Sequence, residues 1–161
     1  MGIYIAVDNG VTGSVAILYN DIVKYHTMPI KRELNYTKKK AWINRIDTFK
    51  LSTLFASLAG LSGIICAVER PMVNPARFKA SMSAIRALEA VQIVLDNIRM
   101  PYSFIDSKEW QKVMLPSGLK GPELKTASDC VAKRLFPNIK FKKNGGGDSL
   151  LIAEYLRRTR L

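Results

Sequence analysis

Three short apolar segments, each followed directly by an acidic residue, constrain the fold of this chain most strongly. They are Ile3–Val7 before Asp8, Ile64–Val68 before Glu69, and Tyr102–Ile105 before Asp106. Runs of β-branched and apolar residues of this length are typical of buried strands. Longer segments with helical patterns separate the three, so we expect parallel strands joined by right-handed crossovers.

The segment after the first strand predicts an antiparallel meander. Ser14–Tyr19 forms a second strand, and a tight turn at Asn20-Asp21 leads into a third, Ile22–Met28. The five strands predict an α/β fold with a mixed sheet, antiparallel in the order 1-2-3 and parallel in the order 1-4-5, flanked by helices. No repeat or linker divides residues 1–161, which we expect to form one domain.

Apolar periodicity and end signals predict the helices that flank this sheet. They are expected at about Trp42–Leu58, Phe78–Arg99, Glu123–Phe136 and from Asp148 onward. The stretch Pro29–Lys40 before the first helix is polar and basic, and we expect it to be an irregular connection.

The charge of the chain indicates a polyanionic partner. It contains 25 Lys and Arg against 13 Asp and Glu, a net charge of +12. A positive field of this size attracts nucleic acid first and an anionic membrane surface second. No apolar run approaches the roughly 20 residues of a membrane-spanning helix, and no secretory leader is recognisable, so we expect a cytoplasmic protein without a membrane partner. Cys66 and Cys130 are typical of free thiols rather than of a zinc site.

Asp8, Glu69 and Asp148 are the candidate metal ligands. Asp8 and Glu69 end strands that are expected to be parallel neighbours, about 4.8 Å apart, and Asp148 begins the last helix after the glycine run 145–147. Singly, Asp8 also fits a turn and Asp148 a helix cap. Jointly, three acids at the ends of converging elements predict a site for hard cations such as Mg²⁺. Such ions support phosphodiester hydrolysis without a histidine or serine nucleophile.

Three motifs around these acids resemble those of the RuvC Holliday junction resolvases. They are VDNGVTGSVA at 7–16, AVERP at 67–71 and GDSLLIAEY at 147–155. The third is similar to the final-helix motif of the bacteriophage members. The first alone also resembles the phosphate-binding turn of actin-like and sugar kinases, but the three together, in the family's order across nearly the whole chain, are more specific. The resemblance implies a ribonuclease H-like fold.

The resemblance also implies an activity. A homodimeric endonuclease of this family nicks opposing strands of four-way DNA junctions, in recombination, repair or phage DNA processing, with a pair of Mg²⁺ ions that Mn²⁺ can replace. The family has a fourth acid three or four residues before the position of Asp148, where this chain has Gly145 and Asn144. Asn144 offers a neutral carbonyl oxygen, and Asp106 is another possible substitute. We therefore expect a weakly held second ion or a weakened catalyst.

Basic and aromatic residues near the motifs are the expected DNA contacts. Lys125, expected to be catalytic, and Lys112 lie in segments similar to those that carry basic residues near the scissile phosphate in the family. Arg77 and Phe78 follow the Glu69 motif, where Phe78 could stack on an unpaired base or could instead be a core residue that caps a helix. Either lysine could equally be an ordinary solvated side chain.

Two further surfaces are assigned from the same resemblance and charge pattern. The cluster Lys38, Lys39 and Lys40 is expected to contact phosphates without reading sequence. The helix at Phe78–Arg99 is the expected dimer interface, because its apolar residues exceed what one sheet face requires. These residues are Met82, Ile85, Leu88, Val91 and Leu95.

Three other functions remain open on sequence alone. An actin-like phosphotransferase needs a second phosphate-binding half, for which 161 residues leave little room. A non-catalytic module that binds branched DNA does not explain the acid cluster, since carboxylates repel phosphates unless a metal intervenes. A ribonuclease H that acts on RNA–DNA hybrids shares the expected fold and chemistry, and only substrate tests separate it from a junction nuclease.

Overall fold

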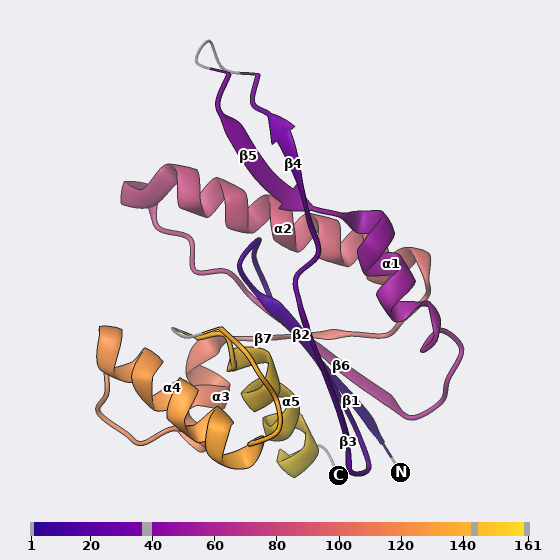
Figure 1. Cartoon of the computed structure of the whole chain (residues 1–161), viewed down its shortest axis with the longest axis vertical. Helices are drawn as coiled ribbons and strands as arrows, with labels where there is room; N and C mark the ends of the chain where they lie inside the picture. Colours follow the sequence, from indigo (N-terminus) through magenta and orange to yellow (C-terminus); the bar gives the residue numbers. More distant parts are fainter. Residues whose placement is uncertain (1, 37–39, 143–144, 160–161) are drawn as a thin grey trace.

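The chain folds around a five-stranded mixed sheet with helices on both faces (Figure 1). A computed structural model describes residues 2–36, 40–142 and 145–159. The strands of the sheet lie in the order β3-β2-β1-β6-β7. Their bounds are β1 Ile3–Asp8, β2 Ser14–Tyr19, β3 Ile22–Thr27, β6 Ile64–Glu69 and β7 Ser103–Ile105.

The directions of the strands match the sequence prediction. β1, β2 and β3 form an antiparallel meander, while β6 pairs parallel with β1 on one side and with β7 on the other. The predicted α/β sheet, with its antiparallel and parallel parts, is therefore confirmed. Because β1 and β6 are parallel neighbours, their carboxyl ends lie at the same edge of the sheet, where ligand sites of such sheets form.

The helices form two layers, with α1 and α2 on one face of the sheet and α3, α4 and α5 on the other (Figure 1). Their bounds are α1 Thr48–Ala56, α2 Phe78–Asn97, α3 Ser107–Met114, α4 Gly121–Leu135 and α5 Asp148–Thr159, with a short 3₁₀ turn, η1, at Pro75–Arg77. None of the described helices is long and apolar enough to cross a membrane.

Alternation along the strands divides the core into two clusters. In β1, Ile3, Ile5 and Val7 pack toward α1 and α2, whereas Tyr4 and Ala6 pack toward the layer of α3, α4 and α5. Successive side chains of a strand point to opposite faces, so a strand buried on both sides is apolar throughout. Helix α5 is buried along most of its length and packs on β1 and β2, which places its first residue over the middle of the sheet.

The segment between β3 and α1 differs from the prediction. It is a two-stranded antiparallel hairpin, β4 (Ile30–Leu34) and β5 (Trp42–Ile46), which projects past α2 (Figure 1) and is called the arm below. The predicted helix starts only at Thr48, because the side chain of Asp47 caps it by accepting from the N–H of Lys50 at 3.1 Å. Apolar residues at 42, 43 and 46 fit a helical period, and pairing with β4 overrides this local pattern.

The region before the predicted helix at 123–136 also contains more structure than expected. Helix α3 follows β7 directly and buries Trp110 and Met114. Helix α4 begins at Gly121, with Pro122 in its first turn, a position where proline costs no helical hydrogen bond. The sequence indicated helical character here without bounds, since eight residues give too few periods to define a short helix.

Candidate active site

Asp8 and Glu69 occupy the carboxyl ends of two adjacent parallel strands. Asp8 is the last residue of β1 and Glu69 the last of β6, and the register between these strands pairs Val7 with Val68. Asp148 is the first residue of α5. Its negative charge contributes to raising the pKa of both other carboxyls, so the three predicted acids lie within electrostatic reach of one another.

The carboxyl groups of Asp8 and Glu69 influence each other's pKa. Burial is the main cause that raises the pKa of Asp8 well above its ordinary value, and the charges of Glu69 and Asp148 raise it further. Burial also raises the pKa of Glu69, although Trp110 opposes this by donating from Nε1 to Glu69 Oε1 at 2.9 Å. Two neighbouring carboxyls without a counter-charge hold a proton between them, and Asp8 is the better place for it.

Asp148 is held in place from α4. The hydroxyl of Ser128 donates to Asp148 Oδ1. Burial raises the pKa of Asp148 to about 6; the hydrogen bond from Ser128 opposes this, the charge of Asp129 adds to it, and the charge of Lys125 opposes it. Lys125 is exposed on α4, yet its positive charge acts on the carboxyl of Asp148.

Asp129 is a fourth acid beside the site, and it was not predicted from the sequence. It lies on α4 with only 9% of its surface exposed, and its Oδ1 accepts from the N–H of Gly145 at 3.0 Å. Ser128 and Asp129 thus hold the two ends of the turn that leads from Gly145 to Asp148. A single acid inside a helical pattern has no sequence signal of its own; only the missing fourth acid of the family could have prompted a search for one elsewhere.

The glycine turn brings the start of α5 close to its neighbours. A Cβ atom at Gly147 would lie 2.5 Å from Cβ of Ala132, so glycine allows α5 to begin directly against α4. On the other side, the hydroxyl of Tyr25 on β3 donates to the carbonyl of Gly146 at 2.7 Å. The position of Asp148 is therefore set by contacts from both a helix and the sheet.

The conformation of the same turn disfavours the introduction of an acid at position 145. Gly145 has φ +94°, and a Cβ there would lie 3.0 Å from Asp148 Oδ2. A side chain at this position is strained and crowds the carboxylate that it is meant to assist. Asn144, which was expected to substitute for the fourth acid, lies outside the described residues.

The donor set fits a hard cation. Asp8, Glu69 and Asp148 offer only carboxylate oxygens, which Mg²⁺ prefers, and their raised pKa values reflect burial and mutual repulsion that a cation relieves. In the described part of the chain, no three Asp, Glu, His or Cys side chains stand in a ready-made coordination geometry.

Asp106 does not join the three acids. Although it follows β7, next to the strand that ends in Glu69, its exposed carboxylate pairs with the guanidinium of Arg70 at 3.3 Å. The same guanidinium lies 5.1 Å from the ring centre of Phe104. Asp106 is therefore part of a surface contact with Arg70 and not a substitute for the missing ligand.

The residues expected to contact DNA are all exposed where the structure describes them. Lys112 on α3 and Lys125 on α4 lie on the helical layer that carries Asp148. Arg77 ends η1 and Phe78 begins α2, and 69% of the Phe78 surface is exposed. The alternative that Phe78 is a core residue is therefore wrong.

The predicted lysine cluster is described only at one position. Lys40 is exposed just before β5 and has a positive φ of 42°. Lys38 and Lys39 lie outside the described residues. The exposed Lys40 leaves the predicted phosphate contact open.

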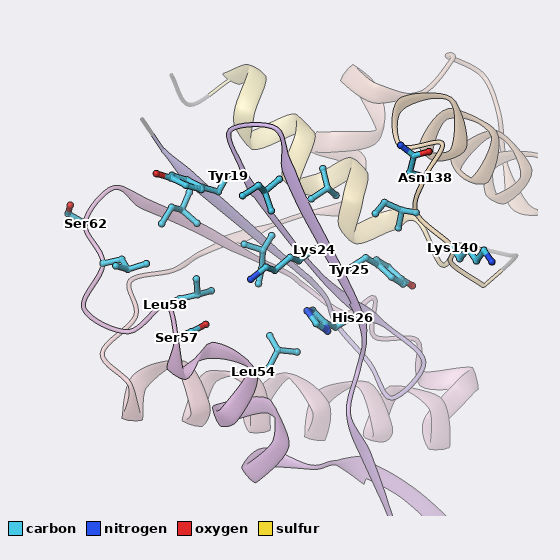
Figure 2. Close-up of a pocket in the computed structure, with 16 residues that line it drawn as sticks. Tyr19, Lys24, Tyr25, His26, Leu54, Ser57, Leu58, Ser62, Asn138 and Lys140 are labelled. Carbon is cyan, nitrogen blue, oxygen red and sulfur yellow. The ribbon is translucent and has the colours of Figure 1, made fainter.

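A cavity of about 1110 Å³ lies along the edge strand β3, between this strand and the end of α1 (Figure 2). Leu54 faces it from α1, Leu58 faces it from the turn after α1, and Lys24 and His26 face it from β3. Its lining, within the described residues, contains no acid. It is thus separate from the carboxylates, although Tyr25, which lines it, also donates to the carbonyl of Gly146 in the glycine turn.

Comparisons with known proteins identify the fold. Neither a protein-family model nor a curated protein sequence matches the chain. Among solved structures, RuvC of Thermus thermophilus in complex with a Holliday junction substrate matches with a TM-score of 0.58 at 9% identity, covering 98% of this chain and 96% of that one. A further structure of Thermus thermophilus RuvC matches with a TM-score of 0.58 at 11% identity, with the same coverage. The chain therefore has the ribonuclease H-like fold of RuvC.

Proposed function

We propose that this protein is a metal-dependent endonuclease that cleaves four-way DNA junctions and related branched DNA. The observation that carries the proposal is the convergence of Asp8, Glu69 and Asp148 at the carboxyl edge of a RuvC-like sheet. One of the similar structures is RuvC with a Holliday junction substrate. The net charge of +12 supports a nucleic-acid substrate, since a positive field of this size attracts polyanions.

Asp8, Glu69 and Asp148 would hold the metal, and Asn144 is the proposed further ligand. Bound Mg²⁺ or Mn²⁺ would activate the attacking water and stabilise the leaving oxygen of the phosphodiester. Trp110 orients Glu69 by its hydrogen bond, and Ser128 orients Asp148. Such hydrogen bonds to ligands fix the direction of their lone pairs and tune their affinity for the ion.

Lys125 is the proposed catalytic cation. Its charge acts on Asp148 across the surface of α4, so a phosphate bound at the acids lies within reach of the same ammonium group. A cation placed there stabilises the charge that develops on the phosphate during hydrolysis. Lys112, Arg77 and Phe78 are proposed contacts to the DNA around the branch.

We further propose that the protein acts as a homodimer through α2. Met82 and Ile85 are exposed and lie three residues apart, which places them on one face of the helix. Val91 and Leu95, which the sequence analysis counted toward this surface, are buried in the core instead. The proposed interface is therefore the first half of α2, and Ile85→Asp is expected to shift the protein toward monomer in sedimentation velocity.

The function is tested with a labelled synthetic junction, a linear duplex and an RNA–DNA hybrid, each with Mg²⁺ or EDTA. We expect paired nicks in the junction with Mg²⁺ and no cleavage in EDTA. Cleavage that persists in EDTA contradicts the metal site, and preferred cleavage of the hybrid supports the ribonuclease H alternative. Junction binding without cleavage under any metal supports a non-catalytic binding protein.

A further inference from the structure

The arm is exposed along most of its two strands. Leu34 and Trp42 face each other across its two strands, with 50% and 59% of their surfaces exposed. The arm reaches the core through Ile46, which is buried. Large apolar side chains that cluster on a projecting hairpin are typical of a surface that a partner covers.

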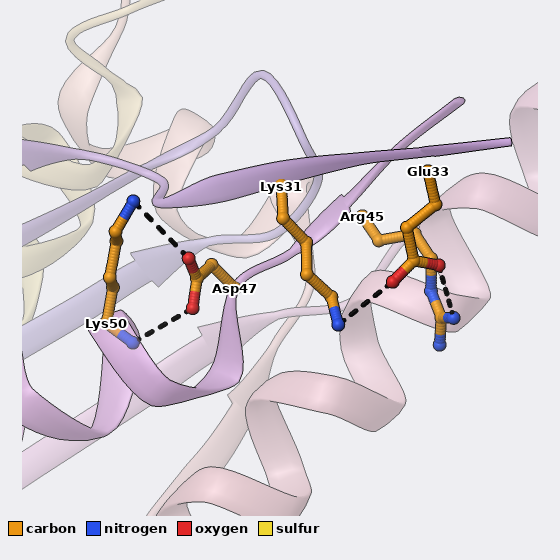
Figure 3. A network of polar contacts seen from close by, with 5 residues as sticks. All are labelled: Lys31, Glu33, Arg45, Asp47 and Lys50. Carbon is orange, nitrogen blue, oxygen red and sulfur yellow. Dashed lines mark hydrogen bonds and ion pairs between the residues drawn. The ribbon is translucent and has the colours of Figure 1, made fainter. Parts of the chain in front are cut away.

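Cations occupy both faces of the arm. Lys31 and Arg45 are opposite each other on one face, where both bind the carboxylate of Glu33, at 2.9 Å and 2.8 Å (Figure 3). Two cations thus share one acid, which holds them side by side and leaves a net positive charge. Strand alternation places Arg32 on the other face.

Arg32 forms no ion pair with an acid in the described part of the chain. Its guanidinium lies 5.4 Å from the ring centre of Trp42, and the described residues contain no ion pair for it. Stacking on the indole holds the guanidinium in a defined plane while its N–H groups remain able to donate. Arg32 and Trp42 together form a flat cationic and aromatic surface next to Leu34.

We propose that the arm binds duplex DNA beside the branch point, with Arg32 and Arg45 on phosphates and Trp42 against the sugars or base edges. The choice of DNA rests on the proposed function. A two-stranded ribbon fits into the major groove, and cations on both of its faces match a groove that has a phosphate backbone along each wall. The contact adds affinity for the DNA without taking part in cleavage.

The first test measures binding to an unbranched duplex of about 20 base pairs in EDTA, by fluorescence anisotropy over a series of salt concentrations. In the Arg32→Gln/Arg45→Gln variant, we expect affinity to fall and the slope of log affinity against log salt to drop by about 2, one for each lost phosphate contact. Lys133→Gln, which removes an exposed cation in the last turn of α4, is the matched control. Equal slopes in the two variants would overturn the proposal.

The second test uses the two tryptophans. Trp110 is 1% exposed and Trp42 is 59% exposed, so collisional quenching by iodide reports mainly on Trp42. Bound duplex is expected to reduce this quenching in the wild type, and Trp42→Phe is expected to abolish the quenchable signal. Unchanged quenching with saturating duplex would show that DNA does not cover the arm.

The results separate this proposal from the nuclease activity. Junction cleavage together with duplex binding that does not depend on the arm rejects the arm and leaves the nuclease intact. Duplex binding that depends on the arm, without metal-dependent cleavage, rejects the nuclease and keeps the arm. A shift from dimer to monomer in the double variant, seen by sedimentation, identifies a second copy of this chain as the partner and overturns the proposal.

Discussion

The carboxylate site and the arm are opposite in charge and in burial. At the site, acids are withdrawn from water and held near one another, so their pKa values rise. On the arm, the acid Glu33 is exposed, and hydrogen bonds from Lys31 and Arg45 lower its pKa. A buried acid cluster that repels itself costs stability, whereas an exposed acid between two cations costs little.

This difference indicates which kind of ligand is expected to stabilise each region. The carboxylates of Asp8, Glu69 and Asp148 are destabilising until a cation arrives, so metal binding is expected to stabilise the fold. The arm needs no metal, and its cations are already placed for an anionic partner. The two regions should therefore respond differently to charge removal, to pH and to metal.

Removal of a carboxylate at the strand ends is expected to have the largest effect. Asp8→Asn or Glu69→Gln should abolish detectable junction cleavage, because each removes an anionic metal ligand. Junction affinity should be retained or rise, since a negative charge next to the phosphates is lost. Cleavage rates and anisotropy on the same labelled junction measure both effects, and parallel loss of binding would show that the acids support the fold rather than the metal.

The stability of the metal-free protein should depend on pH through Asp148. Its folded pKa of about 6 lies above the ordinary value. The contribution of Asp148 to the free energy of unfolding is therefore fully present below about pH 4 and is lost as pH rises through about 6. The difference corresponds to about 3 kcal/mol. In EDTA at pH 8, Asp148→Asn should therefore unfold at higher denaturant concentration than the wild type.

Metal should reverse this order. Added Mg²⁺ is expected to bind the ionised carboxylates and so to stabilise the wild type at pH 8 but to affect Asp148→Asn much less. Chemical denaturation at pH 4.5 and pH 8, with Mg²⁺ or EDTA, gives the four comparisons. Equal stability of the two proteins in EDTA at pH 8 would contradict the raised pKa.

The two regions also differ in how well the sequence predicted them. The site acids follow apolar strands directly, and strand order alone brings the ends of β1 and β6 together, so Asp8 and Glu69 could be placed without coordinates. The arm could not, because the apolar residues at 42, 43 and 46 have the spacing of a helix, although they lie in a strand. The choice depends on pairing with β4, a contact between segments that no local pattern encodes.

Within the site, the residues that hold the acids were harder to predict than the acids. Ser128 donates to the carboxylate of Asp148, and Asp129 accepts from the N–H of Gly145. Tyr25 on the edge strand donates to the carbonyl of Gly146. These contacts join residues of α4, β3 and the glycine turn that are distant in sequence. Their side chains carry no motif, since a serine or an aspartate in a helix is ordinary.

Ser128→Ala tests whether such support matters to the metal. Removal of a hydrogen bond to a metal ligand typically costs about 10-fold to 100-fold in metal affinity or activity, and we expect a loss in this range in Mn²⁺ affinity, measured by electron paramagnetic resonance. Ser149→Ala is the matched control, because its buried hydroxyl lies 2.7 Å from that of Ser14 and has no hydrogen bond to a carboxylate of the described residues. Similar losses in the two variants would indicate a general packing effect.

Lys125→Ala is expected to have a smaller effect that falls on the reaction. Its ammonium group is exposed, so we expect a loss of about tenfold in the single-turnover cleavage rate, below the loss of 100-fold or more for a buried donor. Junction affinity should change little more than in Lys133→Gln. A loss of affinity as large as the loss of rate would make Lys125 an ordinary phosphate contact.

Glu33→Gln should have the smallest effect. Glu33 is an exposed acid between two cations, so its removal should leave the unfolding midpoint unchanged within error. Lys31 and Arg45 then lose their shared counter-charge, and duplex affinity should rise, most clearly at low salt where Coulomb forces are least screened. The same duplex titration that measures the Arg32→Gln/Arg45→Gln variant measures this gain. A fall in affinity would mean that Glu33 is needed to hold the two cations in place, and the arm would then depend on an acid for order just as the site depends on its acids for metal.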